Sequence, residues 1–330
     1  MSSVDVIVPC YGYGRFLRQC VESVLAQSGP AVRVLIIDDE SPDDTPEVAT
    51  ELAREDSRVV SIRHARNKGH IATYNEGLDW ASADYLLLLS ADDYLLPGAL
   101  ARSASLMDAY PEVGFTFGDA IRLTGDEAVP RQDPAREGAQ ILRGLDFIEL
   151  SGPENIVATS TAVVRTELQK HVGGYRAELP HSGDMEMWLR LAACSSVGRV
   201  RARQAVYRQH GENMSRGYMA EFWMPDLQQR LEAFQWFFRT CGNAMADSEQ
   251  LRRRLYRSLG CCAIGFASMA FNEGDLEDSA RLSDFALAIC SSMKLSLPWM
   301  KLECKRRLGF NGWRLLAPVL GRKRRTAAPD

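Results

Sequence analysis

The chain has 330 residues, of which 46% are hydrophobic and 25% are charged, a composition typical of a globular protein with room for two domains. Its net charge of −4 and isoelectric point near 5.8 argue against nonspecific nucleic-acid binding. There is no pattern of a secretory signal, no apolar run approaches the roughly 20 residues of a membrane span, and the eight cysteines lack metal-ligand spacing. We therefore expect a cytoplasmic protein with reduced thiols.

The first part of the chain alternates short apolar runs with longer amphipathic segments, the pattern of a parallel sheet covered by helices. Runs that are apolar throughout predict strands buried on both faces, because such strands have no solvent-facing side. The predicted strands are 4–9, 33–38, 59–64, 84–90 and 114–119, and the predicted helices are 14–28, 43–55, 69–82 and 97–110.

The rest of the chain changes character twice. Residues 120–150 are rich in Gly, Pro and charge and predict a connecting loop or an edge hairpin. A strand at 156–165, a helix at 184–194 and a last strand from 205 follow, and after about residue 217 only helical segments remain, at 219–240, 248–271, 275–293 and 298–308. We therefore expect an α/β domain over 1–217 and a helical domain with a basic tail over 218–330.

Charge is concentrated at the end of the chain. Residues 301–330 contain nine Lys and Arg against two acids, a net charge of +7, so the first 300 residues carry −11. Trp299, Trp313 and several leucines lie in the same segment. One interpretation is a solvated basic terminus beside a packed helix. The other is peripheral contact of 299–325 with the anionic inner face of a membrane.

Acidic residues follow the predicted strands. In a sheet of this kind the ligand site lies at the carboxyl ends of the strands, where this sequence places Asp38, Asp39, Asp92 and Asp93. So many neighbouring carboxylates repel one another unless a cation offsets the charge. A divalent metal that holds a diphosphate would do this with oxygen ligands.

Four motifs in register resemble glycosyltransferase family 2. They are "VDVIVPCYGYGRFLRQCVESVLAQ", "VLIIDDESPDDT", "NKGHIATYNEGL" and "YLLLLSADDYLLPGAL", and the resemblance extends from residue 4 to about 216. It implies the GT-A fold, a Rossmann-like, mostly parallel sheet flanked by helices. It also implies transfer of a sugar from a UDP-, dTDP- or GDP-linked donor with Mn²⁺ or Mg²⁺.

The resemblance assigns roles to the donor side of the site. Pro9 and Tyr11 match positions that line the nucleotide base, and Asp39 matches an acid that accepts a hydrogen bond from it. Asp92 is expected to contact the ribose or metal, and Asp93 is expected to bind the metal. The family usually has Asp-x-Asp-Asp here, whereas this chain has Ser90 in the first position, and Tyr74 stands where the family often has Arg.

The acceptor side resembles the family in "HSGDMEMWLRL" and "YRQHGENMSR". The first implies that Asp184 is the general base of an inverting transfer, taking the proton of the attacking hydroxyl. The second implies that His210 contacts the metal or diphosphate, with help from Arg216. Each acid also stands where a helix cap or turn residue is expected, so capping is the alternative role.

Two other classes of function stay open from the sequence. A nicotinamide-dependent oxidoreductase would need Gly or Ala where Leu17 follows Gly12-x-Gly14, and it would leave Asp92 and Asp93 without a role. An inactive, transferase-like scaffold is favoured only by Ser90. Expected partners are a nucleotide sugar, a glycan, lipid-linked or small-molecule acceptor and a second copy bound through the helical region.

Overall fold

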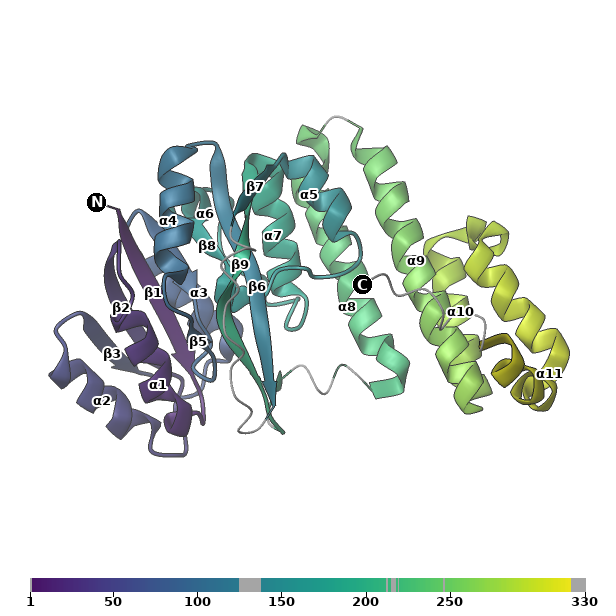
Figure 1. Ribbon diagram of the computed structural model, residues 1–330, viewed down its shortest axis with the longest axis horizontal. Coiled ribbons are helices and arrows are strands. Elements are labelled where there is room, and N and C mark those ends of the chain that lie inside the picture. Colours follow the sequence, from purple (N-terminus) through teal and green to yellow (C-terminus); the bar gives the residue numbers. More distant parts are fainter. Residues whose placement is uncertain are drawn as a thin grey trace. The chain divides into compact units, whose positions relative to one another are not determined.

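The computed structural model describes residues 2–124, 138–211, 213–214, 218, 220–245 and 247–321. It divides into two compact units, Met1–Asn213 and Met214–Asp330 (Figure 1). The first unit is an α/β layer structure and the second consists of helices. Each unit is described by itself.

The first unit opens with strands and helices in alternation. These elements are β1 (Ser3–Cys10), α1 (Gly14–Leu25), β2 (Ala31–Asp38), α2 (Thr45–Glu55), β3 (Val59–Arg63), α3 (His70–Trp80), β4 (Tyr85–Leu88), β5 (Tyr94–Leu95) and α4 (Ala99–Ala109). The long strands and helices agree with those predicted from the apolar runs, and only the two-residue β5 was missed.

The second half of this unit is less regular. It contains β6 (Val113–Thr124), β7 (Ala139–Leu142), α5 (Gly144–Ser151), a 3₁₀ turn η2 (Thr159–Thr161), β8 (Val163–Arg165), α6 (Thr166–Val172), α7 (Gly183–Cys194) and β9 (Ser196–Gln209). We expected a connecting loop or an edge hairpin over 120–150. In the described residues of this range, that expectation is wrong, because β7 pairs with β9 and the helix α5 follows it. The strand expected over 156–165 is reduced to β8, because the Thr161 hydroxyl and amide close a turn onto Ala158 O.

The described strands form one sheet in the order β3-β2-β1-β4-β8-β6-β9-β5, with β7 paired to β9. Strands β1 to β4 are parallel, whereas β8 runs antiparallel to both β4 and β6. The sheet is therefore mostly parallel, as expected, and mixed where β8 is inserted in reverse. Since β9 is parallel to β6, both run in the same direction as β4, and their carboxyl ends reach the same edge.

Helices cover both faces of the β1–β4 half. The even residues of β1, such as Val4 and Val6, share a core cluster with α1, α2 and α4, the layer seen in front in Figure 1. The odd residue Ile7 points the other way, against Gly77 of α3. Burial on both sides explains why β1, β2 and β4 are mainly apolar.

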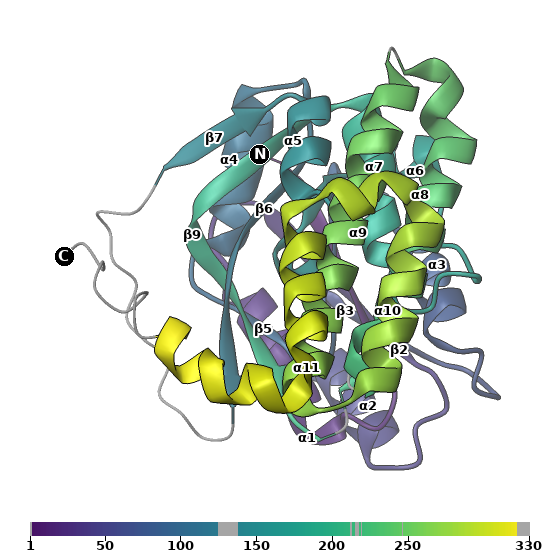
Figure 2. The same cartoon turned by 90° about the vertical axis from the view of Figure 1, so that its right-hand side faces the viewer.

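The second unit contains α8 (Ala220–Cys241), η4 (Gly242–Ala244), α9 (Ser248–Glu273), α10 (Leu276–Ile289), η5 (Ser291–Leu295) and α11 (Leu297–Gly321). Helix α11 bends at Gly309, whose φ of 72° lies in the left-handed region (Figure 2). Among the described residues, no helix combines the length and the apolar character that crossing a bilayer requires.

The packing of α3 on the sheet predicts a steric test. A Cβ added at Gly77 would lie 2.2 Å from Ile7 Cγ2, a buried methyl of a β-branched residue that has no room to move. We expect Gly77→Ala to lower the free energy of unfolding by about 1–3 kcal/mol, as overpacking does, measured by denaturant titration. Gly265→Ala is the control, because that helical position has open space within 4 Å and should gain up to about 1 kcal/mol.

Candidate active site

The turn after β1 is tied to the loop after β2. Asp39 donates its backbone N–H to Cys10 O at 2.9 Å, and Gly12 N donates to Ser41 Oγ at 3.0 Å. Gly12 has a φ of 73°, which favours glycine, and a Cβ at Gly14 would lie 2.2 Å from Asp44 Oδ1. The glycines therefore serve a tight turn and a close backbone approach. Tyr11, between Cys10 and Gly12 in this turn, is half exposed.

Asp39 is buried and anchors the loop that leads into α3. Its Oδ1 lies 2.6 Å from His64 Nδ1 and accepts from Lys68 N, and its Oδ2 accepts from Gly69 N at 2.9 Å. Burial alone would raise the pKa of Asp39, but the contact with His64 and the two amides lower it below its usual value. Asp39 thus remains ionised.

Asp92 and Asp93 follow β4 and are both buried. Burial and the charge of Asp92 raise the pKa of Asp93 to about 8, although hydrogen bonding to the Arg208 amide opposes this. Asp92 Oδ1 accepts no hydrogen bond from the described residues, including those of its own loop. The strand end therefore holds two adjacent carboxylates that repel each other, and one of them has a buried oxygen without a hydrogen-bond partner.

Arg208, at the end of β9, is the residue that the sequence reasoning missed. Its amide donates to Asp93 Oδ1 at 3.1 Å, and its guanidinium donates to Asp92 O and Gln19 Oε1. The guanidinium also lies over the rings of Phe16 and Tyr94, 4.9 and 4.7 Å from their centroids. The sequence feature that pointed to Arg208 was its position two residues before His210 in "YRQHGENMSR".

The structure brings His210 to the same place. His210 Nε2 lies 3.0 Å from Asp92 Oδ2, and its ring packs against Tyr13 and Phe16 of the α1 segment. His210 is therefore held against Asp92, and its expected contact with the metal or diphosphate stays a prediction. Arg216 lies outside the described residues.

Asp184 lies in the first turn of α7, partly buried. One of its oxygens accepts from Asn155 Nδ2 at 2.7 Å and from Thr159 Oγ1 at 3.3 Å. Burial raises the pKa of Asp184, and its hydrogen bonds and the nearby His181 offset this only in part. A carboxylate with a raised pKa suits a general base, which must hold a proton after taking it.

Helix α3 positions the segment that precedes Asp184. His70 Nε2 lies 2.9 Å from Pro180 O, and the rings of Tyr74 and Tyr175 meet edge to face at 5.5 Å. Burial and the charges of Asp184 and Asp92 raise the pKa of Tyr74, so its phenol lies within electrostatic range of both acids and stays neutral. Tyr74 thus senses the charge of Asp184 and, from the acid pair that follows β4, only the charge of Asp92.

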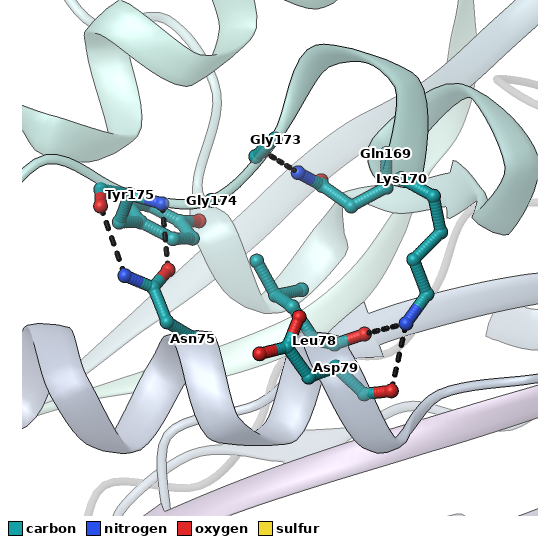
Figure 3. A pocket seen from close by; sticks show the side chains of 8 residues that line it. All are labelled: Asn75, Leu78, Asp79, Gln169, Lys170, Gly173, Gly174 and Tyr175. Carbon is teal, nitrogen blue, oxygen red and sulfur yellow. Dashed lines mark hydrogen bonds between the residues drawn. The ribbon is translucent and has the colours of Figure 1, made fainter.

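A hollow of about 280 Å³ lies along the second half of α3, between that helix and α6 (Figure 3). Asn75 bonds both the N–H and the C=O of Tyr175 there, and Lys170 Nζ donates to Leu78 O and Asp79 O. Its polar side chains mainly hold backbone groups together. Because α3 runs back from the strand ends, the hollow lies away from Asp92 and Asp93. Its side chains hold α3 against the segment that contains α6.

The described residues contain no group of three His, Cys, Asp and Glu side chains arranged to hold a metal ion. Asp92 and Asp93 nevertheless fit one part of a metal site, since they supply an unpartnered oxygen and a repulsion that Arg208 offsets only in part. Mg²⁺ is commonly held by one or two carboxylates together with substrate phosphates, so a full protein cage is not required.

Comparison with known proteins shows the family to which the chain belongs. Residues 5–170, half of the chain, match the family model described as glycosyl transferase family 2. The chain belongs to glycosyl transferase family 2. This membership excludes the nicotinamide oxidoreductase.

Curated relatives match parts of the chain. The uncharacterized protein MT1568 of Mycobacterium tuberculosis is 29% identical over 59% of this chain and 63% of its own length. A GalNAc(5)-diNAcBac-PP-undecaprenol β-1,3-glucosyltransferase of Campylobacter jejuni is 31% identical over 37% of this chain and 39% of its own. The chain thus spans less than two thirds of either relative.

Solved family 2-like structures share the fold. TarS of S. aureus, crystallised with UDP-GlcNAc, covers 98% of this chain and 93% of its own, with a TM-score of 0.67 and 17% identity. The mannosyltransferase PcManGT of Pyrobaculum calidifontis, with GDP-Man and Mn²⁺, covers 95% and 86%, with a TM-score of 0.54 and 18% identity. The GT-A fold expected from the sequence is confirmed.

The contacts of Asp39 predict how it contributes to stability. We expect Asp39→Asn to lower the free energy of unfolding at neutral pH by about 2 kcal/mol, because hydrogen bonds to a charged acceptor are lost. The folded-state pKa is lowered, so the contribution is present above the usual Asp value and fades as pH falls through the folded value. Urea titrations at several pH values measure this.

Asp79→Asn is the matched control, because Asp79 is an exposed acid on α3. It should change the free energy of unfolding by less than about 0.5 kcal/mol. If Asp39→Asn behaves like this control, Asp39 does not anchor the loop.

Proposed function

We propose that the chain is an inverting glycosyltransferase that moves a sugar from a nucleotide-diphosphate sugar to an acceptor hydroxyl with the aid of a divalent metal. One observation carries the proposal. A buried carboxylate pair, Asp92 and Asp93, lies at the strand ends with an unpartnered oxygen on Asp92, and Tyr74 is within electrostatic range of both Asp92 and Asp184, whose pKa is raised. An inverting transfer needs a site for the metal and the leaving diphosphate and a separate carboxylate base, and the proposal assigns the first to Asp92 and Asp93 and the second to Asp184.

The nucleotide base is proposed to bind between Tyr11 and Asp39. Pro9 and the exposed Tyr11 would form one wall, and a phenol ring can stack on a base. Asp39 Oδ2 accepts one hydrogen bond, from Gly69 N, and a carboxylate oxygen has two lone pairs. Asp39 can therefore keep its loop in place and still accept a hydrogen bond from the base.

The diphosphate is proposed to lie at Asp92 and Asp93. These residues would hold the metal together with the phosphates, with His210 orienting Asp92 through their 3.0 Å contact. The bound metal would supply positive charge to the leaving diphosphate. Arg208 holds the Asp92 backbone and the Asp93 carboxylate in place, so the absent acid at Ser90 need not abolish the site.

Asp184 is proposed to be the general base. It would accept the proton of the acceptor hydroxyl as that oxygen attacks the anomeric carbon from the side opposite the diphosphate. Asn155 and Thr159 donate to one carboxylate oxygen, which fixes the carboxylate plane and leaves lone pairs for the acceptor. A single base without a covalent intermediate inverts the anomeric configuration.

The acceptor is proposed to be a glycan, a lipid-linked glycan or a small molecule that enters between α3 and the start of α7. The names of two relatives support a nucleotide-sugar donor and a membrane-linked acceptor: TarS was solved with UDP-GlcNAc, and the Campylobacter enzyme is named for an undecaprenol-linked substrate. Cytoplasmic location, peripheral membrane contact and a homodimer through the helical region belong to the same proposal.

Ligand-induced thermal shifts test the donor site. We expect UDP, dTDP or GDP to raise the melting temperature more with Mn²⁺ or Mg²⁺ than with EDTA, because metal and diphosphate bind together at Asp92 and Asp93. The double variant Asp92→Asn/Asp93→Asn should lose the metal-dependent part of the shift. If no nucleotide gives a metal-dependent shift with the wild type, the proposed donor site is wrong.

Asp184→Asn tests the base. We expect roughly 10²–10⁴-fold slower transfer with unchanged nucleotide affinity, because only proton transfer is removed. The raised pKa of Asp184 should move the acid limb of the kcat/KM profile above the usual carboxyl range. Full activity in the variant would refute the assignment, and nucleotide binding without any sugar transfer in the wild type would favour an inactive scaffold.

The same raised pKa makes charged Asp184 destabilising, so the Asn variant should melt at or above the wild-type temperature at pH 8. That difference should disappear below the usual Asp pKa, where both states of the wild type are protonated.

A further inference from the structure

One side of α11 presents exposed apolar residues in helical register. Leu297, Met300, Cys304 and Leu308 lie at positions i, i+3, i+7 and i+11, which share one face of an α-helix, and all four are exposed. The two leucines are 59% and 49% exposed, far more than core leucines. We call these four residues the apolar face of α11.

The opposite side of the helix is packed within its own unit. Leu302 is buried, and Arg306 donates to Ser279 O of α10 at 2.9 Å. Lys305 Nζ donates to Ser268 Oγ and Asn272 Oδ1 of α9 at 2.6 and 2.9 Å. These contacts fix the rotation of α11, so the apolar face is held outward by the bundle.

Basic residues flank the apolar face on both sides. At 100° per residue, Lys301 lies about 40° to one side of Leu297 and Arg307 about 80° to the other, and both are exposed. Glu303 is the acid between residues 297 and 321, and it lies away from this face, 3.1 Å from Arg306 Nη1. The face and its edges are therefore apolar and cationic.

Exposed leucines also lie next to both ends of this segment. Leu295 precedes the helix with 81% of its surface exposed, and Leu315 follows the Gly309 bend with 79% exposed. Lys294 and Arg314 stand beside these two leucines in the sequence and are exposed as well. Figure 2 shows the bend between the two segments of α11.

We propose that the apolar face of α11 lies in the plane of an anionic lipid bilayer, with its leucines among the acyl chains and Lys301 and Arg307 at the phosphates. Long basic side chains can extend from such a face to the headgroups while their methylene stems stay in apolar surroundings. Among possible occupants, an anionic bilayer satisfies both the apolar centre and the cationic edges.

A second copy of the chain is less complementary to the apolar face of α11 than an anionic bilayer is. In a twofold dimer the same patch meets itself, so the basic edges of one copy would approach those of the other. The face extends over only three helical turns between Leu297 and Leu308, so the membrane contact is reversible and depends strongly on charge. The proposal does not depend on the proposed reaction, because vesicle binding is measured without transfer.

Co-sedimentation of the full chain with vesicles tests the proposal. We expect binding to phosphatidylcholine vesicles that contain phosphatidylglycerol, weaker binding to phosphatidylcholine alone, and loss of the difference at high salt. Lys301→Gln/Arg307→Gln should weaken binding roughly thirty-fold, since each basic residue near an anionic surface contributes roughly five-fold. Leu297→Ser/Leu308→Ser should weaken it at least ten-fold, as lost leucine burial predicts.

Leu276→Ser is the control, because Leu276 is an exposed leucine on α10 and not on this face. It should bind like the wild type, and each variant is compared only if its melting temperature and nucleotide-induced shift are unchanged. The proposal would be overturned if the wild-type chain does not bind anionic vesicles. It would also be overturned if the variants of the apolar face bind them as well as the control does. So would a dimer in gel filtration that the same face variants dissociate.

Discussion

The burial of two adjacent carboxylates is the constraint around which the site is arranged. Asp92 and Asp93 repel each other at the end of β4, and the chain compensates with Arg208 from a strand more than 100 residues later. The guanidinium is itself held between two aromatic rings, so it cannot swing away without losing those contacts. The remaining imbalance is what a cation with a diphosphate would relieve.

A buried ion pair helps to hold the proposed base, Asp184, in position. Glu186 and Arg190, one turn apart on α7, are buried and 2.9 Å apart, and Arg190 also donates to the C=O groups of Val172 and Gly174. Arg176 meets the other Glu186 oxygen at 2.9 Å. Removing one partner would leave a charge uncompensated in the interior, so this cluster ties the loop before Asp184 to its helix.

The sequence is most informative where a local pattern has one physical explanation. Strands β1, β2 and β4 were predictable because burial on both faces makes most of their positions apolar. The acids after the strands were predictable because parallel strands end at one edge. Strand β9 was recognised only from Ala205, because its first half, where Arg199 and Arg201 alternate with buried residues, lacks the continuous apolar run from which the other strands were predicted. Helices α5 and α6 were missed because eight and seven residues are too few to show a period.

The pairing of Arg208 with the two acids lay beyond prediction for a different reason. It depends on β9 lying beside β5, a two-residue strand with no signal of its own. The same holds for His64, which reads as a strand end yet contacts Asp39 and Glu76 at 2.6 and 3.1 Å. Long-range proximity of this kind follows from topology, which composition and periodicity do not encode.

The order of β9 after α7 has a consequence for how the enzyme can diversify. Asp184 begins α7, and β9 follows directly and returns to the same edge with Arg208 and His210. One continuous helix–strand segment therefore carries the groups proposed to act on both substrates, so a shift at the turn between α7 and β9 would disturb both together. Asn155 and Thr159, which hold Asp184, precede α7, so changes there would alter the proposed base without altering the contacts of Arg208 and His210.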